Sequence, residues 1–185
     1  MLQKWILGLG MAAGATGAAA QGMMEFQITV PYRNAQELQT LLAAFPALNV
    51  QHTTSSVRLP ANTSDIQVLQ QSGFQIRERS EITPLSAGAT HVLPGNLPAG
   101  ATQTYSLRLP TQATSVKVRL TGEDGDADLY IGQGFIPTQD DFTCRPYRTG
   151  SDELCIIEND GGDTPLFVVV RADTAVHGVK IAIGN

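Results

Sequence analysis

The chain has 185 residues, of which 42% are hydrophobic, 16% charged and 6% aromatic, and its formal net charge at pH 7 is −5. This composition excludes a wholly disordered chain and leaves room for one medium domain or two small ones. The acidity is uneven, since Leu85 to Asn185 carries seven Lys or Arg and twelve Asp or Glu, against five of each in residues 1–84. An acidic chain without a basic stripe argues against nucleic acid and anionic lipid as partners.

Residues 1–20 have the features of a secretory signal peptide. Lys4 gives a positive n-region, Trp5 to Leu9 and the Gly and Ala residues after them form a short apolar segment, and Ala18 to Ala20 supply small residues for cleavage. No later apolar run is long enough to span a membrane. The sequence therefore predicts an exported chain, secreted to the medium or to the periplasm, with no membrane association after cleavage.

Residues 24–82 predict a small α/β domain, which opens with a strand and a helix. Glu25 to Val30 alternates with a period of two, as a half-buried strand does. Asn34 and Glu37 then fit a capping box, in which each side chain accepts a hydrogen bond from a backbone amide at the start of the helix. Pro46 is expected to end this helix.

The rest of this domain predicts two short strands, a second helix and a last strand. The short strands are expected around residues 48–52 and 57–59, and a second capping box predicts a helix that starts at Ser64 and ends at Gly73. The alternation over residues 74–79 indicates a closing strand. The order strand, helix, strand, strand, helix, strand is that of a ferredoxin-like βαββαβ fold.

Three features of this domain resemble the N-terminal pro-region of secreted bacterial zinc carboxypeptidases. They are the strand that runs into Pro31-Tyr32, the helix that contains Glu37-Leu38, and the segment from Leu69 to Phe74 before the last strand. In that family the domain packs on the enzyme, assists its folding and blocks its active site. A generic small domain without an inhibitory role has the same hydrophobic pattern and stays an open alternative.

A linker and an all-β domain are predicted for the second half. Residues 83–100 are rich in Pro, Gly, Ala, Ser and Thr and carry no Asp, Glu, Lys or Arg, as linkers often do. From residue 101 to 185 the apolar residues alternate with polar ones, and residues 166–170 are apolar without interruption, as in a central strand. Six to eight short strands predict an antiparallel, jelly-roll-like β-sandwich.

Several separated motifs within residues 97–184 resemble the bacterial pre-peptidase C-terminal domain. They are Tyr105-Ser-Leu, Gly125-Asp-Ala-Asp-Leu-Tyr, Cys144-Arg-Pro-Tyr-Arg, Glu153-Leu-Cys and Gly178-Val179, in this order. The resemblance implies a β-sandwich that is appended to secreted peptidases, and some members bind collagen or other insoluble substrates. No His-Glu-x-x-His or Gly-x-Ser-x-Gly motif is present, so no catalytic residue is predicted and the chain is expected not to be an enzyme.

Cys144 and Cys155 are the two cysteines of the chain. In an oxidising compartment, an even pair at this spacing predicts an intrachain disulfide. A zinc site would need further ligands, and the three histidines are scattered along the sequence.

Asp124, Asp126 and Asp128 are candidate calcium ligands, because alternate acidic residues can converge on one cation. An EF-hand loop is excluded, since Leu129 and Phe135 occupy the positions that need Gly and Glu. No cofactor other than this calcium is expected, with further oxygen ligands from residues 158–163. In the alternative, Asp126 and Asp128 are structural: they accept backbone amides in a tight turn or pair with Arg145.

Tyr130, Tyr147 and Arg148 are candidates for a binding surface, because exposed aromatic and arginine side chains often anchor interfaces. Tyr147 follows a proline in a loop, whereas Tyr130 lies in an alternating strand and fits the core equally well.

Two functions follow from these patterns. The first is a secreted, non-catalytic binding or accessory module, associated with extracellular peptidases, whose sandwich binds a protein or a polysaccharide. The second is a pro-domain that acts in trans, as a folding chaperone or inhibitor of a secreted metallocarboxypeptidase.

Overall fold

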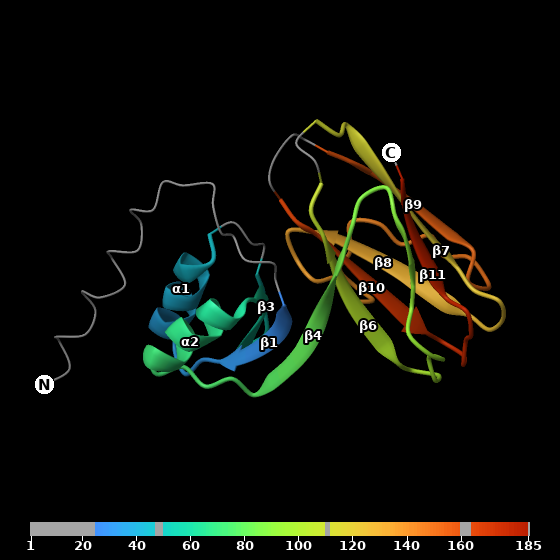
Figure 1. Ribbon diagram of the computed structural model, residues 1–185. Coiled ribbons are helices and arrows are strands. Elements are labelled where there is room, and N and C mark those ends of the chain that lie inside the picture. The colour runs from blue at the N-terminus through green and yellow to red at the C-terminus, as the bar shows by residue number, and fades with distance from the viewer. Residues whose placement is uncertain (1–24, 47–49, 110–111, 160–163, 185) are drawn as a thin grey trace, which may run out of the picture.

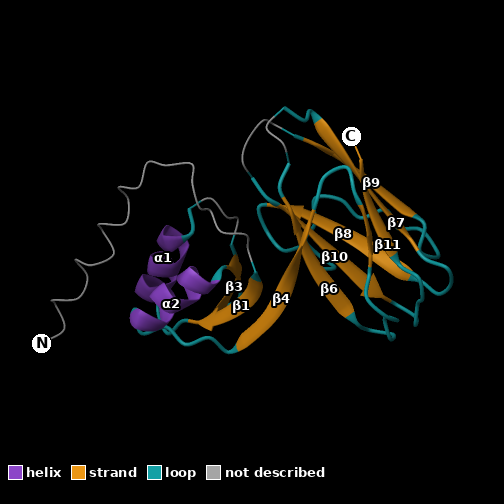
Figure 2. Ribbon diagram, in the orientation of Figure 1, coloured by secondary structure: helices purple, strands orange, loops and turns teal. Residues whose placement is uncertain are grey.

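The computed structural model describes residues 25–46, 50–109, 112–159 and 164–184. The predicted signal peptide lies outside these residues. Within them the chain is mostly β, with two helices and two sheets (Figures 1 and 2). One sheet has seven strands in the order β2-β3-β1-β4-β6-β10-β8, and the other has four in the order β5-β11-β7-β9.

The N-terminal part folds as strand, helix, strand, strand, helix, strand, and its neighbouring strands are antiparallel. Both helices lie on the side of the sheet away from the second half of the chain (Figure 1). A core of eight buried residues, centred on Ile28, Leu41 and Leu59, lies within this part. The elements are β1 (Phe26–Pro31), α1 (Ala35–Ala44), β2 (Gln51–His52), β3 (Ser56–Ala61), α2 (Thr63–Gln71) and β4 (Glu78–Leu85).

The helix caps agree in part with the sequence prediction. The Asn34 side chain accepts the Glu37 amide as expected, but the Glu37 carboxylate accepts the amide of Arg33 rather than that of Asn34. The predicted start of α2 at Ser64 is wrong: Asn62 is the N-cap and forms a reciprocal capping box with Asp65. Gly73 has the positive φ of 87° expected after a helix end.

The last strand of this part also starts later than predicted. Phe74 and Ile76 pack against the N-terminal core without pairing, and β4 begins at Glu78. Residues 78–81 of β4 pair with β1, while residues 82–85 pair in parallel with β6. The predicted linker at 83–100 therefore contains strand residues, and the sheet around it is mixed rather than wholly antiparallel.

The second half forms two sheets that face each other across a core of 21 buried residues. The alternation of Val116, Val118 and Leu120 predicted β7, and all three side chains are buried. β10 is buried on both faces as expected, because Val168 faces this core while Phe167 lies under the loop that carries Ile136. The strands are β5 (Thr90–Val92), β6 (Thr102–Leu107), β7 (Ser115–Thr121), β8 (Ala127–Gln133), β9 (Glu153–Glu158), β10 (Leu166–Ala172) and β11 (Lys180–Gly184).

Candidate binding surface

The loop between β8 and β9 closes the outer edge of the seven-stranded sheet. β8 pairs with β10 on one side, and the loop, together with Glu153 at the start of β9, supplies hydrogen-bond acceptors to its other side. These hydrogen bonds matter because a strand edge whose backbone amides are unpaired can act as a template for another strand. The acceptors are Ser151 Oγ for Ala127 N–H (3.1 Å), Glu153 Oε2 for Leu129 N–H (2.8 Å), Cys144 O for Ile131 N–H (2.9 Å) and Thr143 Oγ1 for Gln133 N–H (3.0 Å).

A disulfide fixes the base of this loop. Cys144 and Cys155 are bonded, with their Cα atoms 6.1 Å apart, and this confirms the predicted pairing. Cys155 lies fully buried in the sandwich core, and the core also packs against Cys144. The loop is therefore attached covalently to β9 as well as by hydrogen bonds to β8.

The three candidate calcium ligands each have a different partner. Asp124 accepts the amide of His177 and lies 2.7 Å from its Nδ1, and these hydrogen bonds lower the pKa of the Asp124 carboxyl. Asp126 accepts the amide of Gly150 at 3.1 Å. Among the described residues no group of three or more His, Cys, Asp or Glu side chains could hold a metal ion, and residues 160–163, named as further ligands, lie outside them.

Asp128 has the structural role that the sequence offered as the alternative. Its side chain is buried and accepts hydrogen bonds from Arg145 Nη2 at 2.8 Å and from the Tyr130 hydroxyl at 2.9 Å. Burial, and then the neighbouring Asp128 carboxylate, raise the pKa of Tyr130 to about 12. Asp128 thus neutralises an arginine that the loop brings against the sheet.

Arg145 lies between two tyrosine rings. Its guanidinium carbon is 4.7 Å from the centre of the Tyr130 ring and 4.1 Å from that of the Tyr147 ring. Both distances are within the range of cation–π contacts. Phe142 makes edge-on contacts with both rings. The buried Tyr130 and the half-buried Arg145 and Phe142 therefore support the outermost ring, that of Tyr147.

Tyr147 and Tyr130 differ in what they can contact. Tyr130 is 1% exposed, so it takes the core position that the sequence offered as the alternative to an exposed binding residue. Tyr147 is 66% exposed and has a φ of 53°, the one positive φ among the described residues other than glycine. A bulky residue in this conformation is uncommon and costs free energy. Arg148 is exposed beside it.

Glu153 belongs to the same region but was not singled out from the sequence. Its carboxylate is fully buried and accepts the amides of Leu129 and Arg148, at 2.8 and 3.1 Å. The pKa of this carboxyl is raised, because the effect of burial exceeds that of the two amide hydrogen bonds, which lower the pKa. A signal existed: in the alternation of β9, Glu153 shares a face with Cys155 and Ile157, which are buried.

This arrangement is a β-sandwich module with a loop that is cross-linked, hydrogen-bonded along a strand and tipped with an exposed aromatic ring. Residues 101–171 match the family model of the bacterial pre-peptidase C-terminal domain. Residues 101–171 are therefore assigned to this family of domains, and curated relatives that share this part of the chain are bacterial proteases. The match falls inside the 97–184 segment expected from the sequence.

The similar proteins include two bacterial proteases. The chain is 38% identical over 78 residues to the neutral protease of Vibrio proteolyticus, covering 42% of this chain and 13% of that protein. It is 40% identical over 73 residues to a zinc metalloprotease of Helicobacter pylori, covering 40% and 28%. The chain thus spans a small part of the length of these relatives.

Among solved structures, the pre-peptidase C-terminal domain of a collagenase from Bacillus anthracis matches with a TM-score of 0.45 and 10% identity. The match covers 58% of this chain and 98% of that one. No helix in the described part of the chain combines the length and the apolar character that a membrane crossing requires.

Proposed function

We propose that this protein is a secreted, non-catalytic accessory module that binds an extracellular protein or polysaccharide through the loop tip at Tyr147. The observation that carries the proposal is the exposed Tyr147 ring, held at a positive φ and supported by Arg145 and Phe142. A ring that is already ordered loses little entropy on binding, so its contacts contribute more to affinity. Arg148 beside it adds a charged donor.

A pull-down with three insoluble polymers, collagen, chitin and peptidoglycan, tests this proposal. The wild-type chain is expected to bind one of them, and Tyr147→Ala to weaken that binding about tenfold or more, as for a central aromatic anchor. Ile156→Ala is the matched control, because Ile156 is 53% exposed on β9 and does not belong to the loop. Wild-type protein that binds none of the polymers, or an equal loss in both variants, would refute the proposal.

We propose further that residues 24–82 are a ferredoxin-like domain distinct from the sandwich. The element order, the antiparallel strand order β2-β3-β1-β4 and a buried cluster separate from that of the sandwich support this division. A core of eight buried residues is small, so this domain should open more readily than the sandwich.

Hydrogen exchange followed by mass spectrometry tests the division on the whole chain. The amides of β1 and β3 are expected to exchange together and at least about tenfold faster than those of β7 and β10. A single common exchange rate for all four strands would contradict it.

A further inference from the structure

A small groove lies where the open face of the N-terminal sheet meets the loop after β8. It has a volume of about 180 Å³, which is smaller than the sites that enclose a whole drug-sized ligand. The side chains of Gln51 and Asp141 are hydrogen-bonded at 2.8 Å and tie the N-terminal sheet to this loop. This hydrogen bond links the two parts of the chain that border the groove. Its lining is Gln27, Arg58, Thr102, Thr104, Tyr130, Ile136, Pro137, Thr138, Gln139, Val169 and Arg171.

The charge of the lining is opposite to that of the chain. It contains two arginines and no Asp or Glu, although the chain as a whole carries 17 acidic and 12 basic residues. Arg58 is exposed and has no hydrogen bond or ion pair within the described part of the chain. Arg171 contacts Asp173 through Nε at 3.1 Å. Guanidinium groups match the planar geometry of a carboxylate, so the groove suits an anionic group of that shape.

The floor of the groove is apolar. Tyr130, Ile136 and Val169 are 1%, 5% and 9% exposed and belong to one buried cluster. An apolar side chain next to a carboxylate would contact this floor while the carboxylate meets the arginines. The C-terminal residue of a peptide has this combination of groups.

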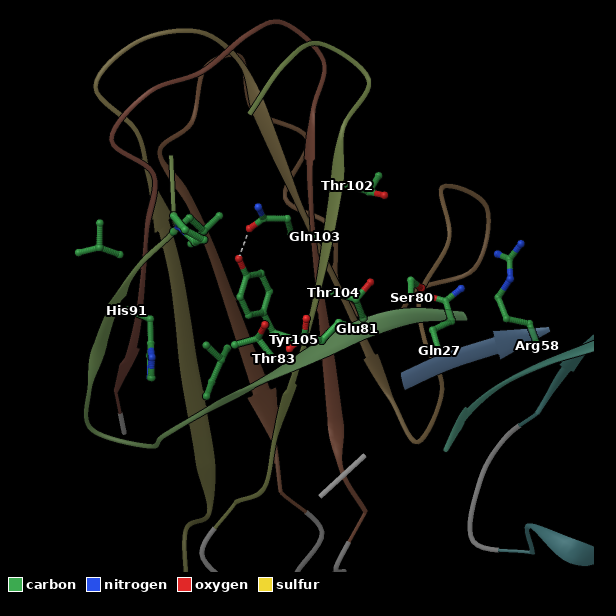
Figure 3. A pocket seen from close by; sticks show the side chains of 14 residues that line it. Gln27, Arg58, Ser80, Glu81, Thr83, His91, Thr102, Gln103, Thr104 and Tyr105 are labelled. Carbon is green, nitrogen blue, oxygen red and sulfur yellow. Dashed lines mark hydrogen bonds between the residues drawn. The ribbon is translucent and has the colours of Figure 1, made fainter. Parts of the chain in front are cut away.

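A larger cleft continues from the groove and favours a peptide over an acidic polysaccharide. The cleft has a volume of about 660 Å³ and shares Gln27, Arg58, Thr102 and Thr104 with the groove. Figure 3 shows Gln27 and Arg58 at one end and His91 at the other, with β4 crossing between them.

Two strand edges border this cleft. Here β4 pairs only with β1 over Glu78–Glu81, and β6 pairs only with β10 at Thr102 and Gln103. Ser80 and Glu81 line the cleft opposite Thr102 and Gln103. Strand edges that face a cleft can hydrogen-bond the backbone of an extended peptide, which a sugar chain does not have.

We propose that the groove binds the C-terminal carboxylate of an extended peptide through Arg58 and Arg171, with the preceding residues in the larger cleft. This inference deepens the proposed binding function and rests on it. It adds a second site, formed by both halves of the chain, with a defined ligand class. Proteases produce such free carboxylates at every cleavage, and the curated relatives that share this domain are themselves proteases.

The test uses the whole chain and a fluorescein-labelled heptapeptide with sequence Gly-Ser-Thr-Ala-Val-Ala-Leu, made with a free C-terminal carboxylate and as the C-terminal amide. Fluorescence anisotropy is expected to show at least tenfold tighter binding of the carboxylate form. Arg58→Gln should weaken that binding at least tenfold, because a charge-assisted pair is lost. Arg77→Gln removes the same charge from an exposed position outside the groove and the larger cleft, and it should leave the affinity unchanged.

Three outcomes would overturn the proposal. The first is equal binding of the two peptide forms, and the second is unchanged affinity in an Arg58→Gln protein that melts at the wild-type temperature. The third is binding of polygalacturonate, but not of the peptide, in an Arg58-dependent manner. Tyr147→Ala should retain the peptide affinity, so a failure at the loop tip and a failure in the groove give different results.

Discussion

Replacement of Asp128 by alanine is expected to lower the free energy of unfolding by about 3–5 kcal/mol, the cost of breaking a buried ion pair by removing one partner. The variant would leave Arg145, whose side chain is 18% exposed, without its counter-charge and the Tyr130 hydroxyl without its acceptor. Urea denaturation followed by circular dichroism measures the loss.

The matched control is Asp152→Ala. Asp152 also pairs with an arginine, Arg119, at 2.9 Å, but the two side chains are 66% and 55% exposed. Solvent screens such a pair, so the expected loss is about 0.5 kcal/mol or less. Removing Arg145 together with Asp128 should restore part of the lost stability, because no unpaired charge remains. Equal losses in the two single variants would show that burial of the Asp128 pair is unimportant.

Removing the disulfide is expected to lower the free energy of unfolding by about 3 kcal/mol, because the bond closes a loop in the unfolded chain and limits its entropy. Cys144 and Cys155 would both be changed to alanine, and urea denaturation would be compared with that of the oxidised wild type. Wild-type protein reduced before unfolding serves as the control, since it loses the bond but keeps both side chains. Identical unfolding curves for oxidised and reduced wild-type protein would contradict the prediction.

Local sequence patterns predicted those elements whose structure is determined by residues close together in the sequence. The period-two alternation of β7, the apolar run of β10 and the glycine after α2 all carry their structural reason within a few residues. The start of α2 was missed because Asn62 and Ser64 both begin an acceptable capping pattern, and the structure uses the earlier one.

The pairing of β4 could not be predicted in this way. Its residues 78–81 and 82–85 have different partners, one near the N-terminus and one beyond residue 100, and local composition holds no information on either. Thr83, Pro84 and Leu85 have the composition of a linker, yet they form part of a strand. The groove at Arg58 was missed for the same reason, because its two arginines are 113 positions apart in sequence (171 − 58) and line one groove only in the folded chain.

The closure of the outer edge of β8 has a consequence for the behaviour of the protein at high concentration. Four successive outward amides of this strand are already occupied, so a second copy of the chain cannot add a strand there without first displacing the loop. That displacement is opposed by the covalent bond at Cys144. The outer edge of β8 is therefore not available as a template for a further strand.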